Sequence, residues 1–122
     1  MKRVETLEGQ GEILDKEKAL RRVAGDEELY AELIESFREE WQDWWMEMEG
    51  ALQEDRGSEV RRYAHTIKGA ADTIGADEVT ALARQVEQRA SEEAWEEVRE
   101  RLPELGRALE RLNRRLVEEV GA

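Results

Sequence analysis

The sequence has no cysteine, and it contains one proline, one phenylalanine and one histidine among its 122 residues. Without cysteine the chain has neither a disulfide framework nor a thiolate metal site, which fits a reducing compartment. No apolar run approaches the roughly 20 residues that a membrane-spanning helix needs. The N-terminal segment also lacks the apolar centre of a signal peptide. We therefore expect a cytoplasmic protein that does not enter a membrane.

Basic residues are in the minority. The chain has 31 acidic side chains against 19 lysines and arginines, a formal net charge of −12. Such an excess of negative charge repels nucleic acid and anionic lipid, so we expect neither as a partner. The length of 122 residues is enough for one domain with a real hydrophobic core, and two domains would be crowded.

Apolar residues recur along most of the chain at spacings of three and four, which predicts amphipathic helices. We expect a short helix after Asp15, a candidate N-cap, and a long helix over residues 26–53. Residues 53–58 are expected to join this helix to the next one, with Gly57 as the helix breaker and Ser58 as the cap of the next helix.

The central helix is predicted over residues 60–74, and Gly75 is expected to end it. The next helix should start at Ala76 or Asp77. A connection this short forces the two helices to lie side by side and antiparallel. The flank of the second helix should therefore lie close to the exposed side of the central one.

A last helix is expected to restart at Ser91. Its apolar stripe stays in phase across Pro103, which predicts one helix that bends near Arg99. Together the elements predict an all-α fold, an antiparallel up-down four-helix bundle with a short additional N-terminal helix, over residues 14–122. Residues 1–13 have little periodic apolar content and are expected to form a mobile lead.

The tryptophans invite a cofactor interpretation, but their spacing favours the core. Trp41, Trp44 and Trp45 lie on the apolar stripe of the long helix, among the aromatic and methionine side chains that a bundle core requires. We expect Trp41 and Trp95 to be buried together between their two helices. One of Trp44 and Trp45 is expected to lie at the edge of the stripe.

His65, the only histidine, lies in the stretch VRRYAHTIKGAADTIG. At about 100° per residue it projects roughly 160° from the centre of the apolar stripe and so faces away from the core. Lys68 can bring its ammonium beside the imidazole. Gly69 leaves the imidazole uncovered, although glycine inside a helix costs about 1 kcal/mol relative to alanine. This combination suits phosphoryl chemistry, and the alternative is a surface histidine without a function.

The segment AHTIKGAADTIGA closely resembles the signature of histidine phosphotransfer (HPt) domains of phosphorelays, and the likeness extends to GDEELYAELIESF and LARQVEQRA. The resemblance implies a four-helix bundle whose histidine receives a phosphoryl group from a receiver aspartate and passes it to another. It implies that His65 is the phosphoacceptor, that Lys68 stabilises charge and that Gly69 gives the partner clearance. Glu87 matches a polar position that can orient the imidazole, and an ordinary solvated glutamate is the alternative.

We therefore predict a phosphocarrier without its own ATP site and not an enzyme. The resemblance implies response-regulator receiver domains and a hybrid sensor kinase as partners, with magnesium on the partner receiver and no cofactor bound to this chain. We expect a monomer. The alternative is a helical adaptor with the HPt fold that binds receivers or kinases without carrying phosphate.

Two enzyme classes are disfavoured by missing residues. A di-iron bundle needs two Glu-x-x-His motifs, whereas this chain has one histidine, and the residue three positions before it is Arg62. An ATP-using kinase needs a glycine-rich phosphate loop or an acidic magnesium cluster, and the sequence has neither.

Overall fold

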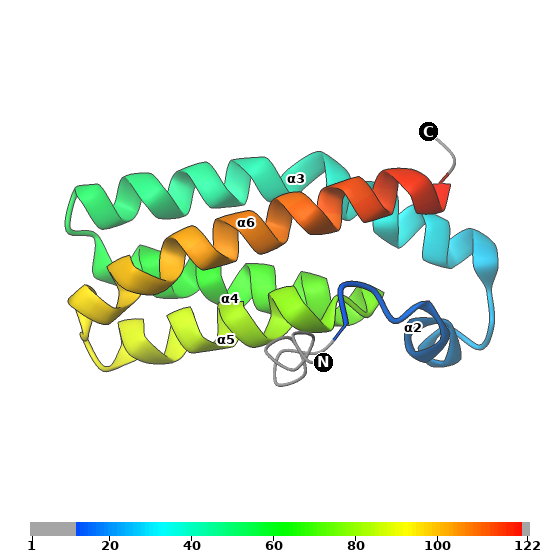
Figure 1. The fold of residues 1–122 in the computed structure, drawn as a ribbon, viewed down its shortest axis with the longest axis horizontal. Helices are drawn as coiled ribbons and strands as arrows, with labels where there is room; N and C mark the ends of the chain where they lie inside the picture. Colours follow the sequence, from blue (N-terminus) through cyan, green and yellow to red (C-terminus); the bar gives the residue numbers. More distant parts are fainter. Residues whose placement is uncertain (1–11, 121–122) are drawn as a thin grey trace, which may run out of the picture.

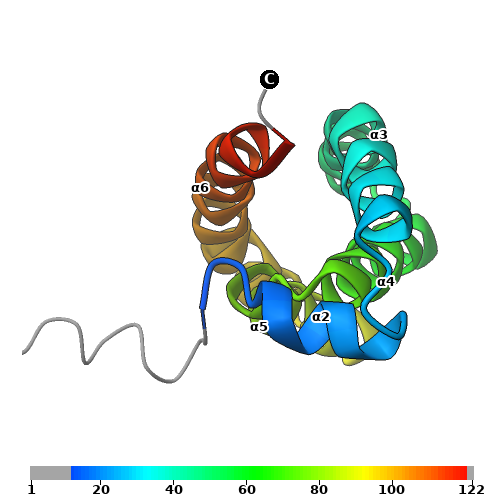
Figure 2. The same cartoon turned by 90° about the vertical axis from the view of Figure 1, so that its right-hand side faces the viewer.

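The computed structural model describes residues 12–120, which form five helices and no strand. The helices are α2 (Lys16–Arg22), α3 (Glu27–Gln53), α4 (Gly57–Ile74), α5 (Asp77–Ser91) and α6 (Trp95–Val120). The four long helices run up and down in chain order, and α6 packs against both α5 and α3 to close the bundle (Figures 1 and 2). This confirms the predicted all-α antiparallel four-helix bundle with a short additional helix. None of the described helices has both the length and the hydropathy needed to span a bilayer.

The short helix α2 lies across one end of the bundle, over the ends of α4 and α5 (Figure 2). Asp15 caps it as predicted, because its side chain accepts a hydrogen bond from the Lys18 amide at 3.1 Å. Most of the predicted N-terminal lead, residues 1–11, lies outside the described residues. Glu12 belongs to the same predicted segment, and its carbonyl accepts a hydrogen bond from the Glu78 amide at 2.9 Å.

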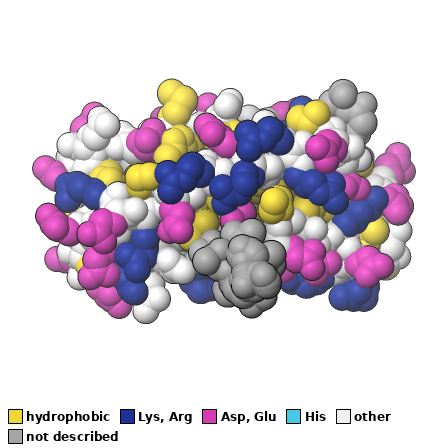
Figure 3. Space-filling model, in the orientation of Figure 1, with side chains coloured by type: hydrophobic (Ala, Val, Ile, Leu, Met, Phe, Trp, Pro, Cys, Tyr) yellow, Lys and Arg dark blue, Asp and Glu magenta, His cyan; other side chains and the backbone are white. Residues whose placement is uncertain are grey.

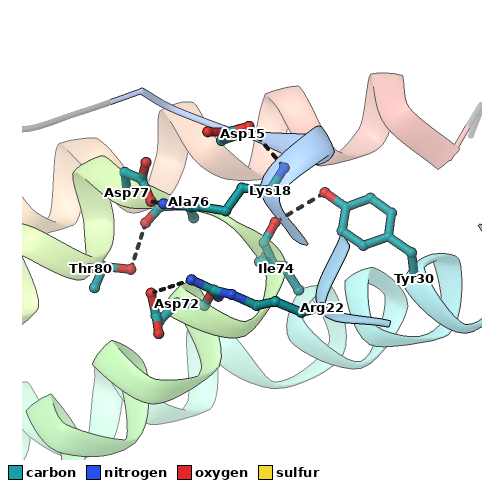
Figure 4. Close-up of polar contacts among 9 residues, drawn as sticks. All are labelled: Asp15, Lys18, Arg22, Tyr30, Asp72, Ile74, Ala76, Asp77 and Thr80. Carbon is teal, nitrogen blue, oxygen red and sulfur yellow. Dashed lines mark hydrogen bonds and ion pairs between the residues drawn. The ribbon is translucent and has the colours of Figure 1, made fainter. Parts of the chain in front are cut away.

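The turn between α4 and α5 is attached to α2 (Figure 4). Lys18 Nζ lies 2.5 Å from Asp77 Oδ1, and the Asp15 amide donates to the Gly75 carbonyl at 2.7 Å. Gly75 ends α4 as predicted, with a φ of +85° that favours glycine. A Cβ at this position would also collide with the Asp15 carbonyl oxygen. The turn therefore requires glycine both for its backbone conformation and for the approach of the chain before α2.

Two further side chains bond the last turn of α4 (Figure 4). Arg22 Nη1 donates to the Asp72 carbonyl at 2.5 Å, and the Tyr30 hydroxyl donates to the Ile74 carbonyl at 3.0 Å. Burial raises the pKa of Tyr30 to about 12, so the hydroxyl keeps its proton at neutral pH. The Tyr30 bond gives the Ile74 carbonyl a partner at the helix C-terminus, where intrahelical donors run out, and both bonds hold the end of α4 in place.

The connection between α3 and α4 differs from the prediction. Gly57 is the first residue of α4 and not a breaker, and Ser58 is not a cap, because Arg56 occupies the N-cap position without a side-chain cap bond. The chain turns at Asp55, two residues before Gly57, where the φ is +59°. Gly57 has a different use: a Cβ there would lie 2.5 Å from Cζ2 of Trp95. The glycine therefore makes room for an indole ring from the far end of the sequence.

The last helix also begins later than predicted. Ser91 is the final residue of α5, and α6 starts at Trp95. The reason is that the amide of Ala94 bonds back to the carbonyl of Arg89 at 2.9 Å, which closes α5 in the manner of a helix C-terminus. The helix α6 then continues through Pro103 without interruption, as predicted.

The tryptophans occupy different depths. Trp41 is only 5% exposed, and its indole donates to Asn113 Oδ1 at 3.2 Å. The expectation that Trp95 is buried with it is wrong, because Trp95 is the first residue of α6 and lies half-buried at the end of the bundle. Trp44 and Trp45 are both partly buried and pack against the core from its edges.

Candidate functional site

His65 lies in the middle of α4 with 66% of its side chain exposed, which confirms that it points away from the core. The opposite side of α4 is buried in the bundle through Val60, Ala64, Ile67, Ala71 and Ile74. The face of the molecule that carries α5 and α6 shows no histidine (Figure 3). Because α4 is fixed at its C-terminus by α2, its exposed side presents the imidazole on a rigid element.

Glu87 on α5 joins the two polar side chains of the predicted site. Its Oε2 lies 2.9 Å from His65 Nδ1, and its Oε1 lies 2.7 Å from Lys68 Nζ. The carboxylate is mostly covered, with 18% of the side chain exposed, whereas the imidazole is open to solvent. The tight turn after α4 is what brings α5 alongside and lets a residue 22 positions later reach His65. The structure thus brings three of the four predicted residues into one network.

The ionisation of Glu87 determines which nitrogen of the neutral His65 imidazole carries the proton. Burial raises the pKa of the carboxyl group, but the hydrogen bonds from Lys68 and His65 outweigh it, so the pKa is lower than usual. This network therefore adds to the stability of the fold at pH values above the pKa that Glu87 has in the unfolded chain. The contribution is lost as the pH falls through the lower pKa that Glu87 has in the folded protein. At neutral pH Glu87 is a carboxylate, which can only accept hydrogen bonds. His65 Nδ1 must then donate, and Nε2 of the neutral ring is left with a free lone pair.

Gly69, the fourth predicted residue, leaves open space one turn after His65. A Cβ at this position would meet no atom within 4 Å, and the backbone has no positive φ. In contrast to Gly57 and Gly75, nothing in the fold requires glycine here. A longer side chain at position 69 would lean toward the N-terminus of α4 and so over the imidazole. The space beside His65 therefore results from the missing side chain at position 69, and the packing of the bundle does not require it.

A shallow apolar groove of about 180 Å³ lies on the α3 side of α4, which the sequence had not indicated. It is lined mainly by Leu33, Phe37, Trp44, Ala70 and Thr73. The sequence places Leu33, Phe37 and Trp44 on one wide apolar stripe of α3, but their spacing does not show which of these side chains remain partly exposed. Trp44 meets Phe37 edge-on, with ring centroids 6.0 Å apart, and forms the edge of the groove. Across residues 12–120 no cluster of three or more histidine, cysteine or acidic side chains could hold a metal ion.

The comparison with protein families assigns the chain. A family model described as Hpt domain matches residues 32–118, which include His65 and its neighbours. The chain belongs to the Hpt domain family. Hpt domains take part in phosphotransfer in two-component signalling as phosphocarriers, and they interact with receiver domains and kinases. Searches of curated proteins and of solved structures gave no match.

In this Hpt domain, the tautomer of His65 should depend on Glu87. In the Glu87→Ala variant the imidazole loses its acceptor, and we expect the neutral ring to change from the Nδ1–H form to a mixture rich in Nε2–H. NMR chemical shifts of the two imidazole nitrogens report this change. Glu87→Gln keeps an oxygen acceptor and should keep most of the Nδ1–H form, and Glu96→Ala, at an exposed site on α6, is the matched control. An unchanged tautomer in Glu87→Ala would contradict the assigned hydrogen bond.

Proposed function

We propose that this Hpt domain is a phosphorelay intermediate in which His65 accepts a phosphoryl group from the aspartate of one receiver domain and passes it to another. The observation that carries the proposal is the contact between His65 Nδ1 and Glu87 at 2.9 Å. It supports a ring held by one nitrogen, with the nucleophilic Nε2 left free on an exposed surface. The proposed partners are receiver domains of response regulators and of a hybrid sensor kinase, and the proposed compartment is the cytoplasm.

The proposed step is a displacement at phosphorus. The Nε2 lone pair attacks the aspartyl phosphate, the bond from phosphorus to the carboxylate oxygen breaks, and its electron pair remains on the receiver aspartate. The imidazole keeps its Nδ1 proton and gains positive charge, which the Glu87 carboxylate offsets. Lys68 is held beside the ring by Glu87 and can offset negative charge on the phosphoryl oxygens. The same step in reverse loads the second receiver, with magnesium supplied by that partner.

The direction of approach follows from what already surrounds His65. The α5 side of the imidazole is occupied by Glu87, whereas Gly69 leaves the helix surface open. The apolar groove that includes Leu33 and Trp44 lies on the α3 side of α4. Partly exposed apolar surface on the helix that carries the reactive group suits a transient protein interface. A receiver that docks over Gly69 and this groove would bring its aspartate to the free nitrogen of His65.

Substitution of Gly69 tests the proposal. Alanine and glutamine at this position should both raise helix stability by roughly 0.5–1 kcal/mol relative to glycine, because no neighbour obstructs them. Glutamine would extend over the imidazole and obstruct the in-line path, so we expect phosphotransfer to slow by at least about tenfold, and less for alanine. The measurements are the transfer rate from a phosphorylated receiver and the melting temperature of each protein.

Gly50 on α3 offers a matched control, since a Cβ there also meets nothing within 4 Å. Gly50→Ala should raise stability in the same way and leave the transfer rate unchanged. Equal transfer rates for glycine, alanine and glutamine at position 69 would contradict the proposal that Gly69 makes room for the receiver beside His65. The adaptor that binds receivers without carrying phosphate would instead show no transfer from a phosphorylated receiver in any of the proteins, the parent included.

A further inference from the structure

The side chains around His65 on α4 are positively charged, in contrast to the chain as a whole. Four residues lie one helical turn from His65, and they are Arg61, Arg62, Lys68 and Gly69. Three of them are cationic and none is acidic, although the chain has a formal net charge of −12. The phosphotransfer step proposed above uses Lys68 and Gly69, and it gives no role to the two arginines.

The acidic residues of α4 and α5 do not cancel the charge of these arginines, because each of them is paired with another cation. The pairs are Glu59 with Arg56, Asp72 with Arg22, Asp77 with Lys18, Glu78 with Arg111 and Glu87 with Lys68. The opposite charges of a close pair largely offset each other at a distance. The net positive charge of this surface therefore comes from arginines outside the pairs.

Arg61 and Arg62 lie on opposite sides of His65. They precede it by four and three residues, which at about 100° per residue places them roughly 40° and 60° to either side of the imidazole. Both are exposed, and Cζ of Arg62 lies 4.5 Å from the centre of the Tyr63 ring, which holds this guanidinium group beside α4. Neighbouring turns bring Cβ atoms to about 5–6 Å, less than the Debye length of about 8 Å at physiological ionic strength, so both charges act on a group bound to His65.

A third exposed arginine comes from the neighbouring helix. Arg84 lies one turn before Glu87 on α5, and Glu87 is the residue that contacts His65. Among the described residues 12–120, neither Arg84 nor the two arginines of α4 form an ion pair. Within that range, the surface around the imidazole thus carries three cations that a partner can pair.

In the described part of the chain, acidic side chains without an ion pair lie at the borders of this positive surface. Glu40 and Glu47 are exposed on α3, four residues before and three residues after Trp44, so they lie on the flank that faces α4. At the other border, Glu93 lines the same hollow as Arg61. The positive surface is therefore limited to the exposed side of α4 and the adjacent part of α5, and it does not extend to the α3 flank.

We propose that Arg61, Arg62 and Arg84 form a cationic rim that steers an acidic receiver surface onto His65, a role that rests on the relay function proposed above. The phosphorylated aspartate of a receiver is anionic, and magnesium prefers carboxylate and other oxygen ligands, so the surface that meets His65 is acidic. Its attraction to the cationic rim raises the rate at which the partners meet in the productive orientation. The arginines act before the transfer step, whereas Lys68 acts during it. The acidic remainder of the chain repels the same surface and so disfavours docking elsewhere on the bundle.

Association rates measured by stopped flow test the cationic rim. The probe is a receiver domain that binds the wild-type chain, loaded with magnesium and beryllium fluoride, which imitates the phosphoryl group. At low ionic strength the double variant Arg61→Glu/Arg62→Glu should associate at least about tenfold more slowly than the wild type, and Arg84→Glu should show a smaller decrease. The differences should shrink at about 0.5 M salt, because screening removes the attraction. The dissociation rates should change less than the association rates.

Two further variants separate steering from other effects. Arg107→Glu/Arg114→Glu makes the same change in net charge at exposed positions of α6, which lies diagonally across the bundle from α4 (Figure 2), and it should associate like the wild type. Arg61→Lys/Arg62→Lys keeps the charge and should also associate like the wild type, because steering requires charge and not the shape of the guanidinium group. All the substituted side chains are exposed, so the melting temperatures should stay close to that of the parent.

The cationic rim would be overturned if salt did not slow association with the wild type, or if the α6 variant associated as slowly as Arg61→Glu/Arg62→Glu. The relay function is tested separately by phosphotransfer: His65→Gln should lose transfer and keep its association rate. Salt-sensitive association without any transfer to the wild-type chain would overturn the relay function and leave the cationic rim standing. Transfer to a wild-type chain that associates no faster than Arg61→Glu/Arg62→Glu would overturn the cationic rim alone, and a chain that associates with no receiver would overturn both.

Discussion

Substituting His65 by glutamine is expected to abolish phosphoryl labelling of the chain by a phosphorylated receiver while leaving its helix content unchanged. The loss should be complete, because His65 is the only imidazole in the sequence. The fold should not suffer, because 66% of the side chain is exposed and its one recorded hydrogen bond is to Glu87. A glutamine amide can still donate to that carboxylate. Acid-labile incorporation of labelled phosphate, together with circular dichroism, checks both parts.

The chemistry of the label provides the control for this experiment. A phosphohistidine in the wild-type chain is lost in acid, and it differs in stability from the acyl phosphate of the receiver that donates it. Wild-type and variant chains should be compared at the same receiver concentration. Labelling that persists in His65→Gln would show that another side chain accepts the phosphoryl group.

Replacing Trp41 by alanine is expected to lower the free energy of unfolding by roughly 3–5 kcal/mol, the range for large aromatic side chains in cores. The indole is only 5% exposed and donates to Asn113, so the change leaves both a cavity and an amide oxygen without its donor. A domain of this size is stable by roughly 5–15 kcal/mol, so the loss is a large share of the total. Urea denaturation followed by circular dichroism measures it.

Trp95→Ala is the matched comparison, with the same change of side chain at a half-buried position. Its ring lies at the end of the bundle against Gly57, where solvent can fill the space that the ring leaves. We expect a clearly smaller loss than for Trp41. Equal losses for the two variants would contradict the difference in burial between the centre and the end of the bundle.

Much of the fold follows from local patterns in the sequence. The recurrence of apolar residues at three and four positions predicts the helices and their buried sides, because helix geometry alone relates spacing to direction. The cap at Asp15 and the end of α4 at Gly75 are also local, since each depends on backbone within a few residues. For the same reason the outward direction of His65 was predictable, because the spacing of apolar residues on its own helix is enough to give it.

Contacts between helices were decided by the tertiary structure. The pattern around Glu87 left its contact with His65 open, because the reach of a side chain on α5 depends on how far that helix is rotated and shifted against α4. The sequence suggested that Gly57 breaks a helix. The structure shows that glycine is needed there to make room for the ring of Trp95, which belongs to a helix that begins 38 residues later. Periodicity shows which side of a helix is buried, but it carries no information about which helix covers that side. The groove beside α4 therefore became visible only when the four helices were packed together.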